Sequence, residues 1–164
     1  MKMLLTRYAP ILMSVLVLGG VACTSAEATL VRDGNETFAE EDWEASLEAY
    51  EQAQQEAPEL AEPYYNAGNA YYRKQEYGSA QQNIENALRT AEGELPGQAN
   101  FNLGNTQFQA EEFESAIEAY KETLRLDPDD QDAKYNLELA LLQLQQEQPG
   151  QQPEGEGDQP QGEQ

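Results

Sequence analysis

The sequence predicts an all-α fold built from repeated pairs of helices, and three observations support this fold class. Glycines recur at Gly34, Gly68 and Gly104, which are separated by 34 and 36 residues. Further columns keep this spacing: Trp43, Tyr77 and Phe113; Ser46, Ala80 and Ala116; Tyr50, Ile84 and Tyr120. Within each period, apolar residues follow the spacing of amphipathic helices. Units of this length stack on their neighbours and bury a common core.

The composition excludes several kinds of function. The 164 residues include 9 Lys and Arg, 31 Asp and Glu, no His and one Cys, with a formal net charge of -22. A catalytic Ser-His-Asp triad and metal sites built on imidazole both need histidine. Nucleic-acid binding relies on basic residues that neutralise phosphates, so it is also excluded. We therefore predict no enzymatic activity, no cofactor and no nucleic-acid partner.

Residues 1–22 have the features of an export signal. Lys2 and Arg7 precede an apolar run over 11–18, and small residues follow up to position 22. This arrangement is typical of exported proteins. The apolar run is shorter than the roughly 20 residues that cross a bilayer.

Two cleavage sites compete after this signal. The segment Gly20-Val21-Ala22-Cys23 resembles the bacterial lipobox, with Gly20 where Leu is usual, and would make Cys23 a lipidated N-terminus. The alternative is cleavage after Ala26-Glu27-Ala28, which releases a soluble protein. We expect lipidation, because Cys23 lies just after the apolar run and is the only cysteine. Loss of residues 1–22 removes two bases and changes the formal charge from -22 to -24.

After a short linker over 23–28, the repeats are predicted at 29–60, 61–96 and 97–130. In the second unit, one apolar stripe includes Gly68 and another includes Ala80, where small side chains let paired helices approach closely. A turn is predicted at 74–76, and a longer loop at 90–97 accounts for the extra residues of this unit.

Residues 131–147 are predicted to form a capping helix. Its face toward the third unit is expected to consist of Tyr135, Leu137, Leu139, Leu141, Leu142 and Leu144. Residues 148–164 contain no aliphatic or aromatic side chain apart from proline, so we predict that this tail is disordered. A calcium loop starting at Asp127 is not expected, because Asp132 occupies the position that requires glycine. We therefore predict no metal site.

The repeat pattern resembles the tetratricopeptide repeat (TPR) family. The resemblance is carried by Tyr64-Tyr65-Asn66-Ala67-Gly68-Asn69-Ala70-Tyr71 and by Phe101-Asn102-Leu103-Gly104-Asn105. It implies a right-handed superhelix of helix-turn-helix repeats, in which the first helix of each repeat lines a concave groove.

The resemblance assigns aromatic and amide side chains to this groove as candidate peptide-binding residues. They are Asn35, Tyr65, Asn66, Asn69, Tyr72, Phe101, Asn102, Asn105, Phe108, Tyr135 and Asn136. Asn can donate to and accept from the backbone of an extended peptide. Alternatively, the same residues stack neighbouring repeats. The lysines of carboxylate-clamp TPR proteins have no counterpart here, so a neutral or basic segment is expected as ligand.

The segment over 134–141, which follows 126–130 and leads into a Gln-rich tail, resembles the bacterial Bat (aerotolerance) TPR proteins. Those proteins occur alongside membrane proteins with von Willebrand A domains. The resemblance implies a non-enzymatic interaction scaffold of the cell envelope or periplasm, with such a protein as partner. An assembly chaperone or pilotin-like lipoprotein that acts transiently on its clients is the alternative.

Overall fold

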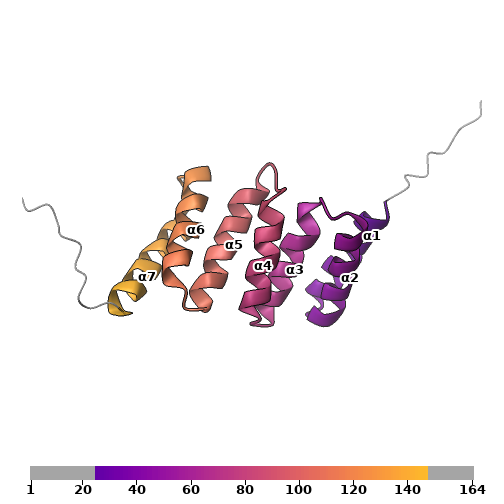
Figure 1. The fold of residues 1–164 in the computed structure, drawn as a ribbon, viewed down its shortest axis with the longest axis horizontal. Coiled ribbons are helices and arrows are strands. Elements are labelled where there is room, and N and C mark those ends of the chain that lie inside the picture. The colour runs from indigo at the N-terminus through magenta and orange to yellow at the C-terminus, as the bar shows by residue number, and fades with distance from the viewer. Residues whose placement is uncertain (1–24, 148–164) are drawn as a thin grey trace, which may run out of the picture.

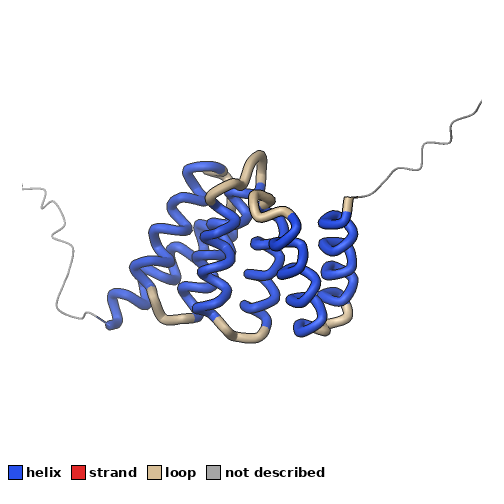
Figure 2. The backbone as a smooth tube through the Cα atoms, turned by 45° about the vertical axis from the view of Figure 1, so that its right-hand side comes forward, coloured by secondary structure: helices blue, strands red, loops and turns tan. Residues whose placement is uncertain are grey.

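The computed structural model describes residues 25–147, and the regular elements of this part of the chain are all helices joined by short loops, without strands (Figures 1 and 2). The predicted all-α fold class is confirmed. The seven helices are α1 (Ala26–Ala39), α2 (Trp43–Glu56), α3 (Ala61–Arg73), α4 (Tyr77–Leu88), α5 (Leu95–Gln109), α6 (Phe113–Leu126) and α7 (Gln131–Glu147). They follow one another along the molecule in chain order (Figure 1).

The helices form three pairs and a final single helix. We call α1, α3, α5 and α7 the A helices, and α2, α4 and α6 the B helices. Each helix packs against the next one in the chain. The backbones of successive A helices also approach each other closely, whereas those of successive B helices lie further apart, and α2 and α4 are joined by a hydrogen bond from Gln54 Nε2 to Asn83 Oδ1 (3.2 Å). The A helices therefore lie closer together and line the inner face of the array.

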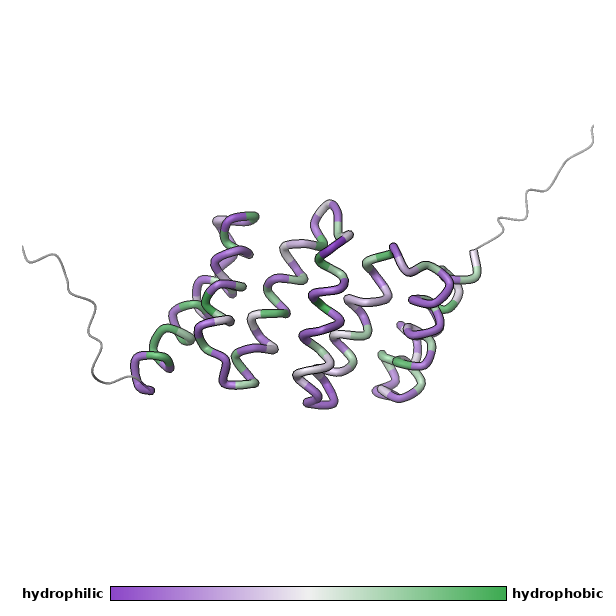
Figure 3. Tube along the Cα trace, viewed as in Figure 1, coloured by the Kyte–Doolittle hydropathy of each residue, from purple (hydrophilic) through white to green (hydrophobic). Residues whose placement is uncertain are grey.

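Each helix pair is held at close range by a small residue. A Cβ atom added at Gly34 or Gly104 would lie 2.5 or 2.6 Å from the ring of Tyr50 or Tyr120. At Gly68 the same atom would lie 2.6 Å from Cγ1 of Ile84. The glycine column of the sequence thus marks the places where an A helix touches its B helix. Figure 3 shows apolar and polar residues mixed along the helices, as expected where one side of a helix is buried and the other faces water.

The turn inside each pair also repeats. Glu41, Gln75 and Glu111 adopt a left-handed backbone with φ of 62°. The predicted turn at 74–76 agrees with the end of α3 at Arg73 and the start of α4 at Tyr77.

Two element boundaries differ from the sequence prediction. Helix α1 begins at Ala26, inside the predicted linker 23–28. Helix α5 begins at Leu95, so the irregular segment covers only 89–94 instead of 90–97. The reason is that Pro96 lies in the first turn of α5, where proline has no helical hydrogen bond to lose.

The packing of α7 differs in part from the prediction. Leu137 and Leu144 pack against the core of α6, as expected. Tyr135, however, is 66% exposed, and Leu141 and Leu142 are each 49% exposed. These side chains stay exposed because no further helix follows α7 in the described chain.

Between residues 25 and 147, no helix combines the length and apolar character that a membrane span needs. The predicted export signal, Cys23 and the tail 148–164 lie outside the described residues.

Candidate functional site

The inner face carries a chain of hydrogen-bonded asparagines, which we call the amide ladder. It consists of Asn35, Asn66, Asn69, Asn102, Asn105 and Asn136. In each rung, an Asn Nδ2 donates to an Asn Oδ1 of the preceding repeat. The three rungs are Asn66 to Asn35 (3.1 Å), Asn102 to Asn69 (2.8 Å) and Asn136 to Asn105 (2.9 Å). The ladder therefore connects each A helix to the next.

Tyrosine hydroxyls from the B helices complete two of the rungs. Tyr50 donates to Asn35 Oδ1 over 2.8 Å, and Tyr120 donates to Asn105 Oδ1 over 2.9 Å. The corresponding residue in the second pair is Ile84, which has no hydroxyl. Asn69 Oδ1 consequently has one donor, while the Oδ1 atoms of Asn35 and Asn105 each have two.

The buried tyrosines remain reliable donors over a wide pH range. Tyr50 and Tyr120 are each 1% exposed. Burial raises the pKa of Tyr50 to about 12, with a smaller contribution from Glu62. Burial also raises the pKa of Tyr120 well above its usual range. Both hydroxyls therefore hold their protons at physiological pH.

Two pockets open beside the ladder, and residues of neighbouring repeats meet in them. The first, of about 220 Å³, is lined by Phe38, Asn69, Tyr72, Arg73, Asn102, Asn105 and Thr106. The second, of about 270 Å³, is lined by Tyr72, Asn105, Phe108, Gln109, Tyr120, Asn136 and Leu139. In the described structure, the Nδ2 groups of Asn69 and Asn105 carry no hydrogen bond. These amides can therefore donate to a ligand lying in the groove.

The aromatic residues of the groove are held in place by their own repeats. Tyr72 packs on Tyr77 with ring centroids 5.9 Å apart, and Phe108 packs on Phe113 at 5.3 Å. Such contacts hold the two rings in place while leaving them half-buried. The rings can therefore bind apolar groups of a ligand with little further loss of side-chain freedom.

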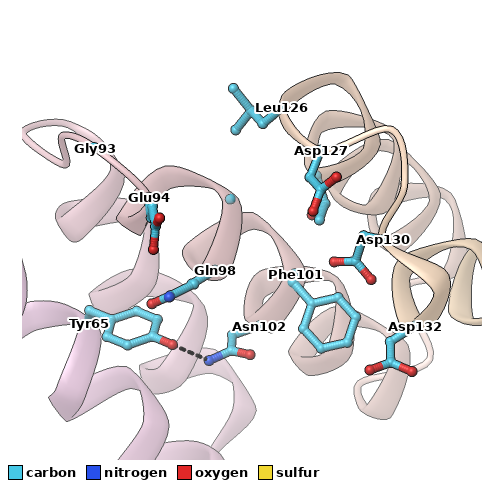
Figure 4. A pocket seen from close by; sticks show the side chains of 12 residues that line it. Tyr65, Gly93, Glu94, Gln98, Phe101, Asn102, Leu126, Asp127, Asp130 and Asp132 are labelled. Carbon is cyan, nitrogen blue, oxygen red and sulfur yellow. Dashed lines mark hydrogen bonds between the residues drawn. The ribbon is translucent and has the colours of Figure 1, made fainter.

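A larger cavity of about 760 Å³ opens next to the ladder, between the segment 89–94 and the turn that joins α6 to α7 (Figure 4). Tyr65, Phe101 and Asn102 line it together with acidic residues. Asn102 also donates to the hydroxyl of Tyr65 over 2.9 Å.

The candidate residues are thus placed in three ways. Eight of them line the pockets: Tyr65, Asn69, Tyr72, Phe101, Asn102, Asn105, Phe108 and Asn136. Asn35 and Asn66 form the first rung of the ladder. Tyr135 points into solvent at the C-terminal end.

The family models agree with this geometry. Residues 65–131 and 101–150 match a model described as tetratricopeptide repeat, and residues 34–75 match one described as TPR repeat. The chain belongs to the tetratricopeptide repeat family. The TPR resemblance seen in the sequence is confirmed. No curated protein matches the chain.

Solved TPR domains have the same fold as this TPR array. The Sgt2 TPR domain from Aspergillus fumigatus matches with a TM-score of 0.69 and 21% identity, covering 83% of this chain and 90% of that one. The first TPR of Spaghetti (RPAP3), bound to the HSP90 peptide SRMEEVD, matches with a TM-score of 0.68 and 20% identity over 72% and 92% of the two chains. The second TPR domain of human RPAP3, in complex with the HSP70 peptide SGPTIEEVD, matches with a TM-score of 0.64 and 20% identity over 70% and 98%.

Sequence reasoning missed two features of this TPR groove. It did not assign hydroxyl donors to the ladder, although the column Tyr50, Ile84 and Tyr120 already carried that signal. It also missed the acidic cavity, whose walls come from segments distant in sequence.

Proposed function

We propose that this TPR array is a non-enzymatic scaffold that binds an extended, neutral or basic segment of a partner protein in the groove lined by the A helices. The observation that carries the proposal is the pair of unoccupied amide donors, Asn69 and Asn105, beside two pockets with aromatic walls. Asn69 has an additional free acceptor site, so it can both donate to and accept from a peptide backbone.

The charge of the groove supports a ligand different from those of the solved relatives. The peptides SRMEEVD and SGPTIEEVD, bound in the RPAP3 structures, both carry acidic C-terminal sequences. Among the residues that line the three pockets here, Arg73 is the one base, and it lines the 220 Å³ pocket. Its guanidinium already lies 5.0 Å from the centre of the Trp43 ring and 3.9 Å from the carboxylate of Glu41. A groove with so few bases favours a neutral or cationic segment.

The experiment starts from a partner captured by mild crosslinking and co-purification with the full chain. Its affinity is then measured for the wild type and for Asn69→Ala, beside the thermal midpoint of each protein. Loss of one net hydrogen bond predicts affinity about two- to tenfold lower. The midpoint should change little, because Asn102 retains its bond to Tyr65.

Two further variants separate binding from folding. Asn86→Ala, on the B helix α4, is the matched control and should change neither quantity. Asn105→Ala should lower the free energy of unfolding by roughly 1–3 kcal/mol, and the thermal midpoint with it, because the buried hydroxyl of Tyr120 loses its acceptor. If Asn69→Ala binds the partner as tightly as the wild type does, the proposal that the amide ladder binds the partner segment is contradicted.

We also propose that the protein works in the bacterial cell envelope, tethered by a lipid on Cys23, with a von Willebrand A domain membrane protein as partner. The start of α1 at Ala26 favours the lipobox over the alternative site, because cleavage after Ala28 would cut within the first turn of this helix. Intact mass of the native protein tests the anchor. A mature chain that starts at Thr29 without acyl mass would overturn it.

A further inference from the structure

The cavity beside Phe101 is the largest of the described pockets that face the ladder, at about 760 Å³. This volume lies within the range of roughly 300–1,000 Å³ that is usual for ligand pockets. Figure 4 shows the ring of Phe101 in its middle, with three aspartates on one side and Glu94, Gln98 and Tyr65 on the other.

The cavity has a strongly negative lining. Four carboxylates line it, those of Glu94, Asp127, Asp130 and Asp132, and none of the twelve lining residues is basic. Asp127 accepts from the backbone N–H of Asp129 over 3.0 Å, and Asp130 accepts from that of Ala133 over 2.9 Å. In each case one carboxylate oxygen makes the bond, so the other stays available to a ligand.

The carboxylates of the cavity are too dispersed to form a metal site. Over residues 25–147, no three acidic side chains converge closely enough to hold a metal ion. A flat guanidinium group can instead reach several separated carboxylates through its five donors.

The aromatic wall of the cavity further restricts which cationic side chain fits. One side of the Phe101 ring packs on Tyr120, with centroids 6.1 Å apart, and the ring also lines the cavity. Guanidinium groups stack on aromatic faces, and an Arg stem covers apolar surface such as Leu126. The combination of ring and carboxylates favours Arg over the compact ammonium of Lys.

The cavity adjoins the groove, because Asn102 lines both this cavity and the 220 Å³ pocket of the ladder. A segment whose backbone lies along the ladder can therefore place one side chain here. The chain's own residues 148–164 do not suit the cavity, since they contain acidic residues and no base.

We infer that this cavity binds an arginine side chain of the partner segment, seated between Phe101 and the surrounding carboxylates. The inference rests on the proposed function, because the same partner occupies the groove. It adds a defined specificity: a positively charged residue must lie in register with the third repeat.

The probe is the blocked tripeptide acetyl-Leu-Arg-Leu-amide, titrated into the ¹⁵N-labelled full chain and followed by NMR. The matched peptide carries citrulline, which keeps the shape of Arg without its charge. The Arg peptide should shift the amide signals of Gly93, Gly97, Phe101 and Asp130, and it should bind at least about fivefold more tightly than the citrulline peptide. Equal binding of the two peptides, no shift at all, or shifts spread over the whole acidic surface would overturn the inference.

A pair of variants tests the carboxylates. Glu94→Gln with Asp132→Asn changes two side chains that make no hydrogen bond in the described structure, so the fold should persist, as the NMR spectrum and thermal midpoint will show. Affinity for the Arg peptide should fall about tenfold, which corresponds to about 1.4 kcal/mol. The control, Glu56→Gln with Glu85→Gln, removes the same charge at two exposed residues that do not line the cavity, and it should retain the affinity. Equal losses in both double variants would overturn the inference.

Failure here is distinguishable from failure of the proposed function. Suppose that Asn69→Ala weakens binding of the captured partner but Glu94→Gln with Asp132→Asn does not. The groove is then the binding site, and the assignment of the cavity to an arginine side chain is wrong. If neither change weakens the partner, the proposed function fails as well.

Discussion

At the scale of single residues, the glycine column sets the distance between the helices of each pair. A Cβ at Gly104 would meet the ring of Tyr120, which is fixed by burial and by its bond to Asn105. We therefore predict that Gly104→Ala destabilises the protein by about 1–3 kcal/mol, the usual cost of overpacking. Thermal or urea unfolding measures this change.

Gly78 in α4 provides the control for that prediction. A Cβ there meets no atom within 4 Å, so Gly78→Ala gains helix propensity without a clash. It should stabilise the protein by up to about 1 kcal/mol. Equal effects of the two substitutions would contradict the view that the glycine column is a packing requirement.

Another residue-scale prediction concerns alkaline pH. Tyr50 ionises near pH 10 in an unfolded chain, but burial raises its folded pKa to about 12. The folded state therefore holds the proton more tightly. The resulting stability is complete below pH 10 and is lost as the pH rises toward 12. The thermal midpoint should fall across this interval, with Tyr absorbance near 295 nm following the ionisation.

Tyr50→Phe should make this pH dependence shallower, although it lowers stability at neutral pH by roughly 0.5–1.5 kcal/mol through loss of the bond to Asn35. Tyr135→Phe changes an exposed ring and serves as the control. A midpoint independent of pH between 10 and 12 in the wild type would contradict the prediction.

At the scale of elements, α7 ends the array with two different faces. Leu144 packs on the core cluster that includes Tyr120 and Ala140, whereas Leu141 is half exposed. We predict that Leu144→Ala costs about 1–3 kcal/mol, part of the cost of removing a fully buried Leu. Leu141→Ala should stay within about 0.5 kcal/mol, as expected for surface changes. Urea unfolding compares the two, and equal losses would show that the outer face of α7 is also covered.

The helices themselves could be predicted because the patterns that indicate them are spacings along the sequence. The glycine column and the apolar stripes depend only on spacing, and both match the observed pairs. The exposed face of α7 could not be obtained in this way, because periodicity identifies an apolar stripe without showing which part has a neighbour. Similarly, the start of α5 depended on the local preference of Pro96 for a first helical turn.

The candidate site was predictable to a similar extent. The repeat register identified the asparagines of the inner face, but their mutual bonds depend on contacts between successive repeats. Those bonds divide the amides into Asn35 and Asn105, whose acceptors are filled, and Asn69, which has spare capacity. The acidic cavity needs the folded array, since Glu94 comes from the connection before α5 and Asp132 from the first turn of α7.

At the scale of the whole molecule, the formal charge of -22 opposes the compact state. Most of the ion pairs in the described chain join exposed side chains, such as Arg32 with Asp33 and Lys121 with Glu118. Pairs of this kind contribute about 0–1 kcal/mol each, so they do not offset the large excess of acids. Each repeat also contacts only its neighbours, so there is no large central core to compensate.

We therefore predict that salt stabilises the protein. In 1 M KCl the screening length falls to about 3 Å, which weakens the repulsion between surface carboxylates. The thermal midpoint should rise by at least about 3 °C between low salt and 1 M KCl, equivalent to roughly 1 kcal/mol. The triple variant Glu56→Gln, Glu59→Gln and Glu85→Gln should raise the low-salt midpoint and reduce its dependence on KCl, because these carboxylates are exposed and form no ion pair in the described structure. A midpoint that stays flat or falls with salt would mean that the attractive pairs outweigh the repulsion.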